Sequence, residues 1–137
     1  MIKIDELIPL INEAFNNNKT FTMPIKGTSM QPLWHTGSLV ELDKISSVKP
    51  RDILFYQRED GSYVLHRLWK IKNGKYYMIG DHQLNLETIN PNQCFAKVIA
   101  YHTKKGKKKN MNNFTYKLYC FSLRFWFIRR VYIKCLH

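Results

Sequence analysis

Acidic residues, cysteines and long uncharged apolar runs are all scarce in this sequence. Its 137 residues include 10 Asp or Glu against 22 Lys or Arg, so the formal net charge is +12. Such a charge favours an anionic partner, either nucleic acid or an acidic membrane surface, although it says nothing about the fold. The three cysteines lie far apart, without a Cys-x-x-Cys pair or a Cys/His cluster. We therefore expect no disulfide framework, no metal site and a reducing compartment.

The start of the chain lacks the uninterrupted apolar stretch of a secretory signal. Asp5, Glu6 and Glu13 interrupt the segment MIKIDELIPLINEAF. The same segment instead predicts a short amphipathic helix within residues 1–20, with Asp5 as its N-cap. Its apolar positions recur at roughly helical spacing: Leu7, Ile8, Leu10, Ile11 and Phe15.

The middle of the chain is rich in short apolar runs separated by turn residues. A content of 45% hydrophobic and 14% aromatic residues is enough for one domain with a real core. The segments REDGS and KNGK read as hairpin connections, so a mainly β domain is predicted over residues 21–103. The expected strands are residues 38–45, 52–57, 62–71, 75–80 and 94–102.

Three polar residues stand out against this β pattern. Ser29 lies between a Gly and a Pro in the segment IKGTSMQPLW, His66 lies within the apolar run YVLHRLWKI, and Asp81 follows a glycine at a strand end. Taken singly, they read as a turn hydroxyl, a satisfied strand histidine and an Asx-turn residue. Their order along the chain favours a functional interpretation of all three.

In this order the motifs resemble those of the signal peptidase I superfamily of serine proteases, which includes the LexA-type repressors. The Ser-Met-x-Pro nucleophile motif is matched by residues 29–32, the two following strand motifs by residues 37–40 and 51–54, and the Gly-Asp box by residues 80–81. The resemblance covers residues from about 21 to 101 and implies a signal peptidase/LexA-like β domain. The His-Arg pair at residues 66–67 is similar to the endoplasmic-reticulum-type branch, whose general base is His instead of Lys.

The resemblance implies a catalytic role for each of these residues. Ser29 would be the nucleophile and His66 the general base, since a Ser hydroxyl needs a base near neutrality and the ordinary imidazole pKa is about 6.5. Asp81 would orient and stabilise the imidazole. The residues around the nucleophile would bind substrate: Gly27, Thr28, Met30 and Pro32. Backbone N–H groups near Ser29 would hold the oxyanion. Such a site needs no cofactor and no metal.

Two further sets of residues bear on the same site. Where family members with a His base carry additional Asn and Asp residues after the Gly-Asp box, this chain has Asn85 and Glu87. Lys70 lies four residues beyond His66 in one expected strand, so the two-residue period of a strand would place both on one face. Lys70 is therefore the nearest competing base.

The C-terminal segment, residues 104–137, is basic and aromatic. Residues 114–136 are long enough to span a bilayer, but five of them are Lys or Arg, which disfavours insertion. We expect the segment to lie at a membrane interface, with aromatic rings in the headgroup region and lysines on acidic lipids. The alternative is a helix or strand that covers the β domain.

These observations predict a serine endopeptidase that cleaves a leader or signal segment from a peptide precursor. The substrate would lie extended beside a strand, and the enzyme would be cytoplasmic or peripheral at the cytoplasmic face of a membrane. The alternative is a non-catalytic basic module that binds membrane or nucleic acid on a peptidase-like fold. Nucleic acid is the less favoured partner because no aromatic-basic motif or helix-turn-helix pattern is evident before residue 21. A self-cleaving regulator is disfavoured by the His base.

Overall fold

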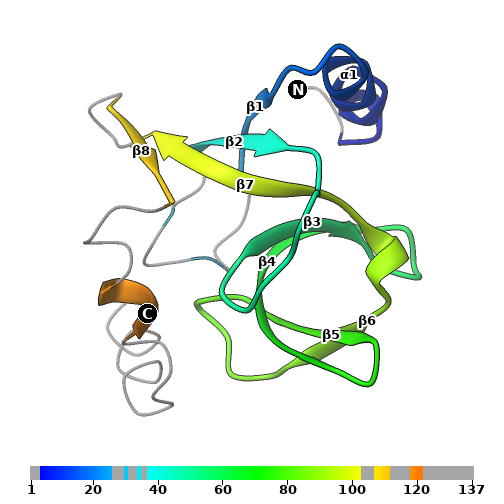
Figure 1. The fold of residues 1–137 in the computed structure, drawn as a ribbon, viewed down its shortest axis with the longest axis vertical. Helices are drawn as coiled ribbons and strands as arrows, with labels where there is room; N and C mark the ends of the chain where they lie inside the picture. The colour runs from blue at the N-terminus through cyan, green and yellow to red at the C-terminus, as the bar shows by residue number, and fades with distance from the viewer. Residues whose placement is uncertain are drawn as a thin grey trace.

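The computed structural model of the protein describes residues 4–25, 30, 34, 37–102, 107–111 and 118–121. One helix precedes an eight-stranded sheet, so the predicted mainly β fold is confirmed (Figure 1). The elements in chain order are α1 (Ile4–Asn16), β1 (Phe21–Pro24), β2 (Leu39–Asp43), β3 (Ile53–Gln57), β4 (Tyr63–Lys72), β5 (Lys75–Ile79), β6 (Glu87–Ile89), the 3-10 turn η1 (Pro91–Gln93), β7 (Cys94–His102) and β8 (Lys108–Asn110).

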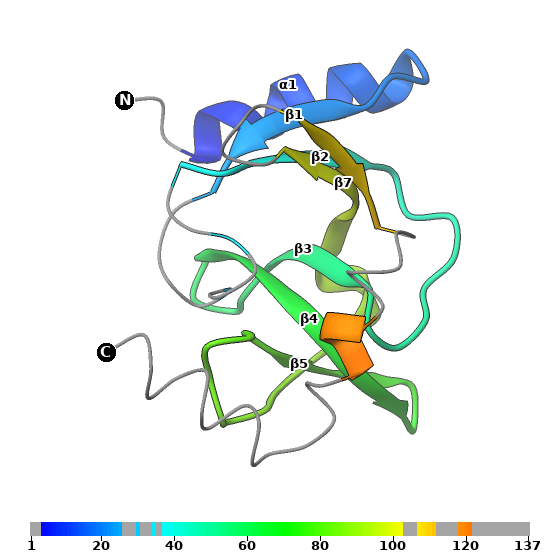
Figure 2. The ribbon, with the colours of Figure 1, turned by 90° about the vertical axis from the view of Figure 1, so that its left-hand side faces the viewer.

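The sheet is antiparallel throughout, in the order β1-β2-β7-β3-β4-β5-β6, with β8 paired to β7. The long strand β7 lies between β2 and β3 and so joins the two halves of the sheet. Helix α1 covers the β1 and β2 end (Figure 2). At the other end, strands β3 to β6 curl around so that β6 approaches β3 (Figure 1).

Two apolar clusters form on opposite faces of β3. Ile53 and Phe55 pack into the first cluster, with α1, β1, β2 and β7. Leu54 and Tyr56 pack into the second, with β4, β5 and β6. Successive strand residues face opposite sides, so a strand buried on both faces must be apolar at every position. This explains why residues 53–56 lack the polar alternation of a surface strand.

The five expected strands all form, within one or two residues of their predicted ends. The KNGK hairpin also forms, with Asn73 and Gly74 at φ of 52° and 71°, the left-handed conformation that a tight two-residue turn requires. Three further strands, β1, β6 and β8, were not predicted, because each has only three or four residues, too few for an alternating pattern to be recognised. Asp5 lies inside the first turn of α1 and is not its cap.

The expectation for Lys70 is wrong because β4 contains a bulge. The pairing of β4 with β5 shifts register between Leu68 and Lys70, so Trp69 is an extra residue. Lys70 now pairs with Tyr77, and its ammonium lies 4.8 Å from the centre of that ring. Leu68, in contrast, pairs with Met78 and stays in the second cluster with the face that carries His66. The bulge therefore turns Lys70 away from the candidate base.

Candidate active site

His66 is buried in the second half of the sheet, 3% exposed. It lies directly opposite Leu54 of β3, so its imidazole faces the second cluster. Its Nδ1 lies 3.2 Å from the hydroxyl of Tyr56, and the two rings meet edge to face. Burial lowers the pKa of His66 to about 4, an effect only partly opposed by the charge of Glu87. The ordinary value of about 6.5 expected from sequence therefore does not apply, and the imidazole is neutral at neutral pH.

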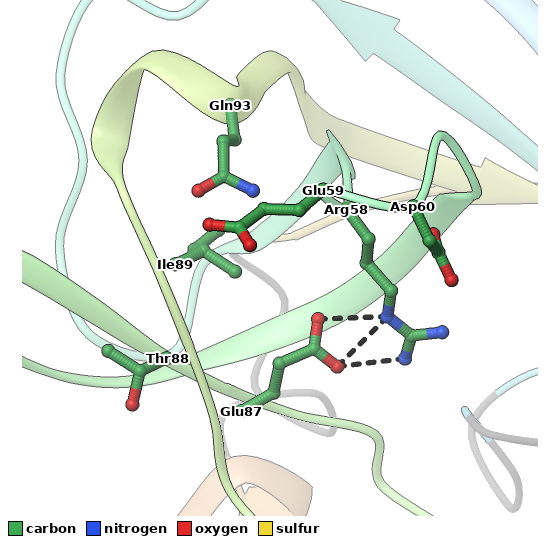
Figure 3. Close-up of a pocket in the computed structure, with 7 residues that line it drawn as sticks. All are labelled: Arg58, Glu59, Asp60, Glu87, Thr88, Ile89 and Gln93. Atoms are coloured by element: carbon green, nitrogen blue, oxygen red, sulfur yellow. Dashed lines mark hydrogen bonds and ion pairs between the residues drawn. The ribbon is translucent and has the colours of Figure 1, made fainter.

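The Tyr56 hydroxyl continues a chain of polar contacts to the protein surface. It donates to Glu87 Oε1 over 3.1 Å, and Arg58 holds the same carboxylate through Nε and a terminal nitrogen at 2.8 to 3.0 Å. Figure 3 shows the Arg58 and Glu87 side chains pointing toward each other. Burial works to raise the pKa of Glu87, but the hydrogen bonds and charge of Arg58 lower it overall, so the carboxylate is ionised.

Arg58 and Glu87 also line a pocket of about 330 Å³. Its other walls come from the β3–β4 turn, β6 and η1: Glu59, Asp60, Thr88, Ile89 and Gln93 (Figure 3). The pocket is polar, and its wall at Glu87 is two hydrogen bonds away from the His66 ring. The surface on this side of the sheet is thus linked to the imidazole through Tyr56.

Asp81 is fully buried, and its carboxylate binds Arg67. Its two oxygens accept hydrogen bonds from Arg67 Nε and a terminal nitrogen at 2.7 and 2.8 Å, and the Tyr119 hydroxyl donates a third at 2.8 Å. Arg67 follows His66 in β4, so the two side chains leave the strand on opposite faces. Among the described contacts, the partner of the imidazole is Tyr56, and the expected bond from the imidazole to Asp81 is not formed.

The segment that carries Ser29 is closed at its base. The amide of Ile25 donates to the Ser38 carbonyl and the amide of Gly37 donates to the Ile25 carbonyl, each over 2.9 Å. Met30 and Trp34 are 3% and 2% exposed and pack into the first cluster. These contacts hold Ile25, Met30, Trp34 and Gly37 against the β domain.

The other predicted residues of this loop, Gly27, Thr28, Ser29 and Pro32, lie outside the described residues. Met30 is described, and its side chain is an anchor in the core.

A family model described as Peptidase S24-like matches residues 2–99. The chain belongs to the Peptidase S24-like family. This places it in the LexA/signal peptidase I superfamily, as the motifs predicted, and the matched residues include the 25–38 loop, His66 and Asp81. No curated protein and no solved structure matches the chain.

For this member of the family, sequence reasoning missed Tyr56 as the partner of His66 and Arg58 as the partner of Glu87. Tyr56 sits in an apolar strand and reads as a core residue, so only the β3–β4 register reveals its contact with His66. Glu87 carried a partial signal, since the family resemblance draws attention to polar residues after the Gly-Asp box. Its distance in sequence from Tyr56, 31 residues, hid the connection.

The described parts of the C-terminal segment contact the β domain. Residues 108–110 form β8 and pair with β7, so the sheet extends past the expected boundary at residue 103. Residues 118–121, orange in Figure 2, place Tyr119 on Asp81 and the buried thiol of Cys120 3.1 Å from an Arg67 nitrogen. No helix among the described residues is long and apolar enough to cross a bilayer. The contacts of these described residues agree with the alternative expectation, in which the C-terminal segment covers the β domain.

Proposed function

We propose that this protein is a serine endopeptidase of the Ser-His type, which removes a leader or signal segment from a peptide precursor. The observation that carries the proposal is the state of His66: a buried, neutral imidazole whose Nδ1 is engaged, in a domain of a peptidase family. A base must be unprotonated before it can accept a proton. The Ser-Met-x-Pro motif supplies Ser29 as the nucleophile.

The proposed reaction has two halves. His66 Nε2 takes the Ser29 hydroxyl proton as the oxygen attacks the scissile carbonyl, and the imidazolium then protonates the leaving amine as the C–N bond breaks. A water molecule next attacks the acyl-enzyme, gives its proton to His66 and releases the new carboxylate, and Ser29 recovers its proton. Backbone N–H groups of the loop would hold the oxyanion, with Gly27 and Thr28 beside it.

The substrate would be an extended peptide paired with a strand, as suits an antiparallel sheet whose terminal strands β1 and β6 each pair with one described strand. Lysines in the C-terminal segment would bring the enzyme to an anionic membrane surface, at the cytoplasmic face. A His base would make the protein similar to the endoplasmic-reticulum-type branch of the superfamily. No cofactor takes part.

The test is cleavage of a defined library of synthetic peptides by the purified full chain, read by mass spectrometry. Cleavage should be lost in Ser29→Ala and His66→Ala and kept in Ser46→Ala, a matched control at an exposed serine. Cleavage that persists in Ser29→Ala would refute Ser29 as the nucleophile. A tagged Ser29→Ala copy of the chain, mixed with the native chain, serves as a second substrate. If the native chain cleaves neither the peptides nor this copy, a peptidase that acts on other molecules is refuted.

The charge of +12 favours a second candidate, a non-catalytic module that binds an anionic surface. It predicts salt-sensitive binding to acidic vesicles without peptide cleavage by the native chain. The peptide library separates the two candidates, because only the peptidase gives products that depend on Ser29.

A further inference from the structure

The two neighbours of the Tyr56 hydroxyl determine which of them accepts its proton. Tyr56 contacts two groups, the Glu87 carboxylate at 3.1 Å and His66 Nδ1 at 3.2 Å. A phenol has one proton to donate, and an ionised carboxylate can only accept. The proton therefore goes to Glu87, where the bond is also the stronger of the two because its acceptor is charged.

The direction of the Tyr56 proton fixes that of the imidazole proton. Once the hydroxyl donates to Glu87, its oxygen can only accept from His66, so Nδ1 must carry the ring proton. A neutral imidazole has one N–H, which leaves Nε2 with a free lone pair. Nε2 is then the atom that can accept a proton from a nucleophile.

Arg58 makes this arrangement stable. Its guanidinium holds both oxygens of Glu87 and keeps that carboxylate ionised. Burial and the adjacent Glu87 charge raise the pKa of Tyr56 above its ordinary value, so the phenol keeps its proton. The ion pair of Arg58 with Glu87 therefore sets the direction of donation in both hydrogen bonds, from His66 to Tyr56 and from Tyr56 to Glu87.

We propose that Tyr56 is a positioning residue for the general base, which holds His66 in the Nδ1–H tautomer through a hydroxyl oriented by Glu87 and Arg58. In a Ser-His-Asp site, a carboxylate bound directly to Nδ1 sets the tautomer. Here Asp81 is engaged by Arg67 and Tyr119, and Tyr56 relays the effect of Glu87 instead. The benefit to catalysis rests on the proposed function. The assignment of the tautomer rests only on the contacts of Tyr56.

The test is ¹⁵N NMR of the His66 ring in the full chain at neutral pH, which distinguishes Nδ1–H from Nε2–H directly. The native protein should show Nδ1–H. Tyr56→Phe removes the acceptor, so the ring should shift to Nε2–H. Tyr63→Phe, a half-buried tyrosine that stacks on Phe55, is the matched control and should leave the tautomer unchanged.

A second variant tests the relay without altering Tyr56. In Glu87→Ala the hydroxyl loses its charged acceptor and is free to donate to Nδ1, so His66 should switch to Nε2–H. Glu59→Ala removes an equal charge from the wall of the same pocket and should not switch it. A residue that only supported packing would not change the tautomer.

Cleavage provides the second readout. Tyr56→Phe should lower kcat by roughly tenfold or more with little change in KM, since the base would present the wrong nitrogen. Native protein in the Nε2–H form, or an Nδ1–H form that persists in both Tyr56→Phe and Glu87→Ala, would overturn the inference. Failure of the proposed function would appear separately, as cleavage independent of Ser29 with the tautomer results intact.

Discussion

Acidification should destabilise this protein through one buried group, His66. Its pKa is lowered by burial from 6.5 to about 4, while in the unfolded chain it returns to its ordinary value. Between these two values the unfolded chain binds a proton that the folded protein does not, so stability rises with pH across this window. The contribution of the neutral His66 imidazole to stability is fully retained above pH 6.5 and is lost as the pH falls toward 4.

The magnitude follows from the size of the shift. Each pKa unit corresponds to about 1.4 kcal/mol, so a shift from 6.5 to about 4 amounts to about 3 kcal/mol. A domain of this kind is stable by only about 5 to 15 kcal/mol, so the loss is a large fraction of the total. The lowered pKa of Glu87 contributes a loss in the same direction, but at lower pH, as that carboxylate protonates.

The assay is urea unfolding of the native chain and His66→Asn at a series of pH values from about 7.5 to 4. Asn cannot titrate but can still donate a hydrogen bond to Tyr56, so it isolates the contribution of the imidazole. Between those limits the native chain should lose about 3 kcal/mol more than the variant, because contributions from other groups largely cancel. If the free energy of unfolding falls equally in the two proteins, the pKa of His66 is not lowered in the folded protein. That result would refute the argument from its burial.

Three other outcomes follow from the same structure. Arg67→Met should cost about 3 to 5 kcal/mol in urea unfolding because it leaves the Asp81 charge buried without its cation, whereas Arg58→Met, at a half-exposed pair, should cost about 1 kcal/mol or less. Peptide cleavage by the native chain should be nearly independent of pH above about 5.5, since the base is already neutral there, and a midpoint near 6.5 in kcat/KM would contradict this. Binding to anionic vesicles in a sedimentation assay should weaken when salt is added. It should also weaken when four lysines are replaced by Gln: Lys104, Lys105, Lys107 and Lys109. Neutral vesicles are the control.

The sequence by itself determined the elements whose signals are local. Apolar runs of β-branched and aromatic residues predicted β2, β3, β4, β5 and β7, and the Asn73–Gly74 turn followed from the need for positive φ at both positions. The amphipathic spacing of residues 4–16 predicted α1 in the same way. The ordered set of motifs at residues 29–32, 37–40, 51–54 and 80–81 indicated the superfamily.

Short strands and irregularities depended on their partners. Strand β8 is Lys108–Asn110, a charged segment without β character of its own, and it forms because β7 offers an open edge at Ala100 to His102. The bulge at Trp69 likewise arises in the pairing of β4 with β5 and reversed the orientation expected for Lys70. A periodicity argument assumes a regular ladder, so it cannot locate a bulge.

Only the tertiary structure decided which groups surround His66. Tyr56 reaches His66 through the β3–β4 register, and Glu87 reaches Tyr56 because the sheet curls and returns β6, three strands away in the sheet order, to β3. Asp81 meets Arg67 instead of His66 because neighbouring residues of a strand face opposite sides. Hydrogen bonds act over about 3 Å, so the protonation state of a buried imidazole depends on register and curvature, which are properties of the assembled sheet.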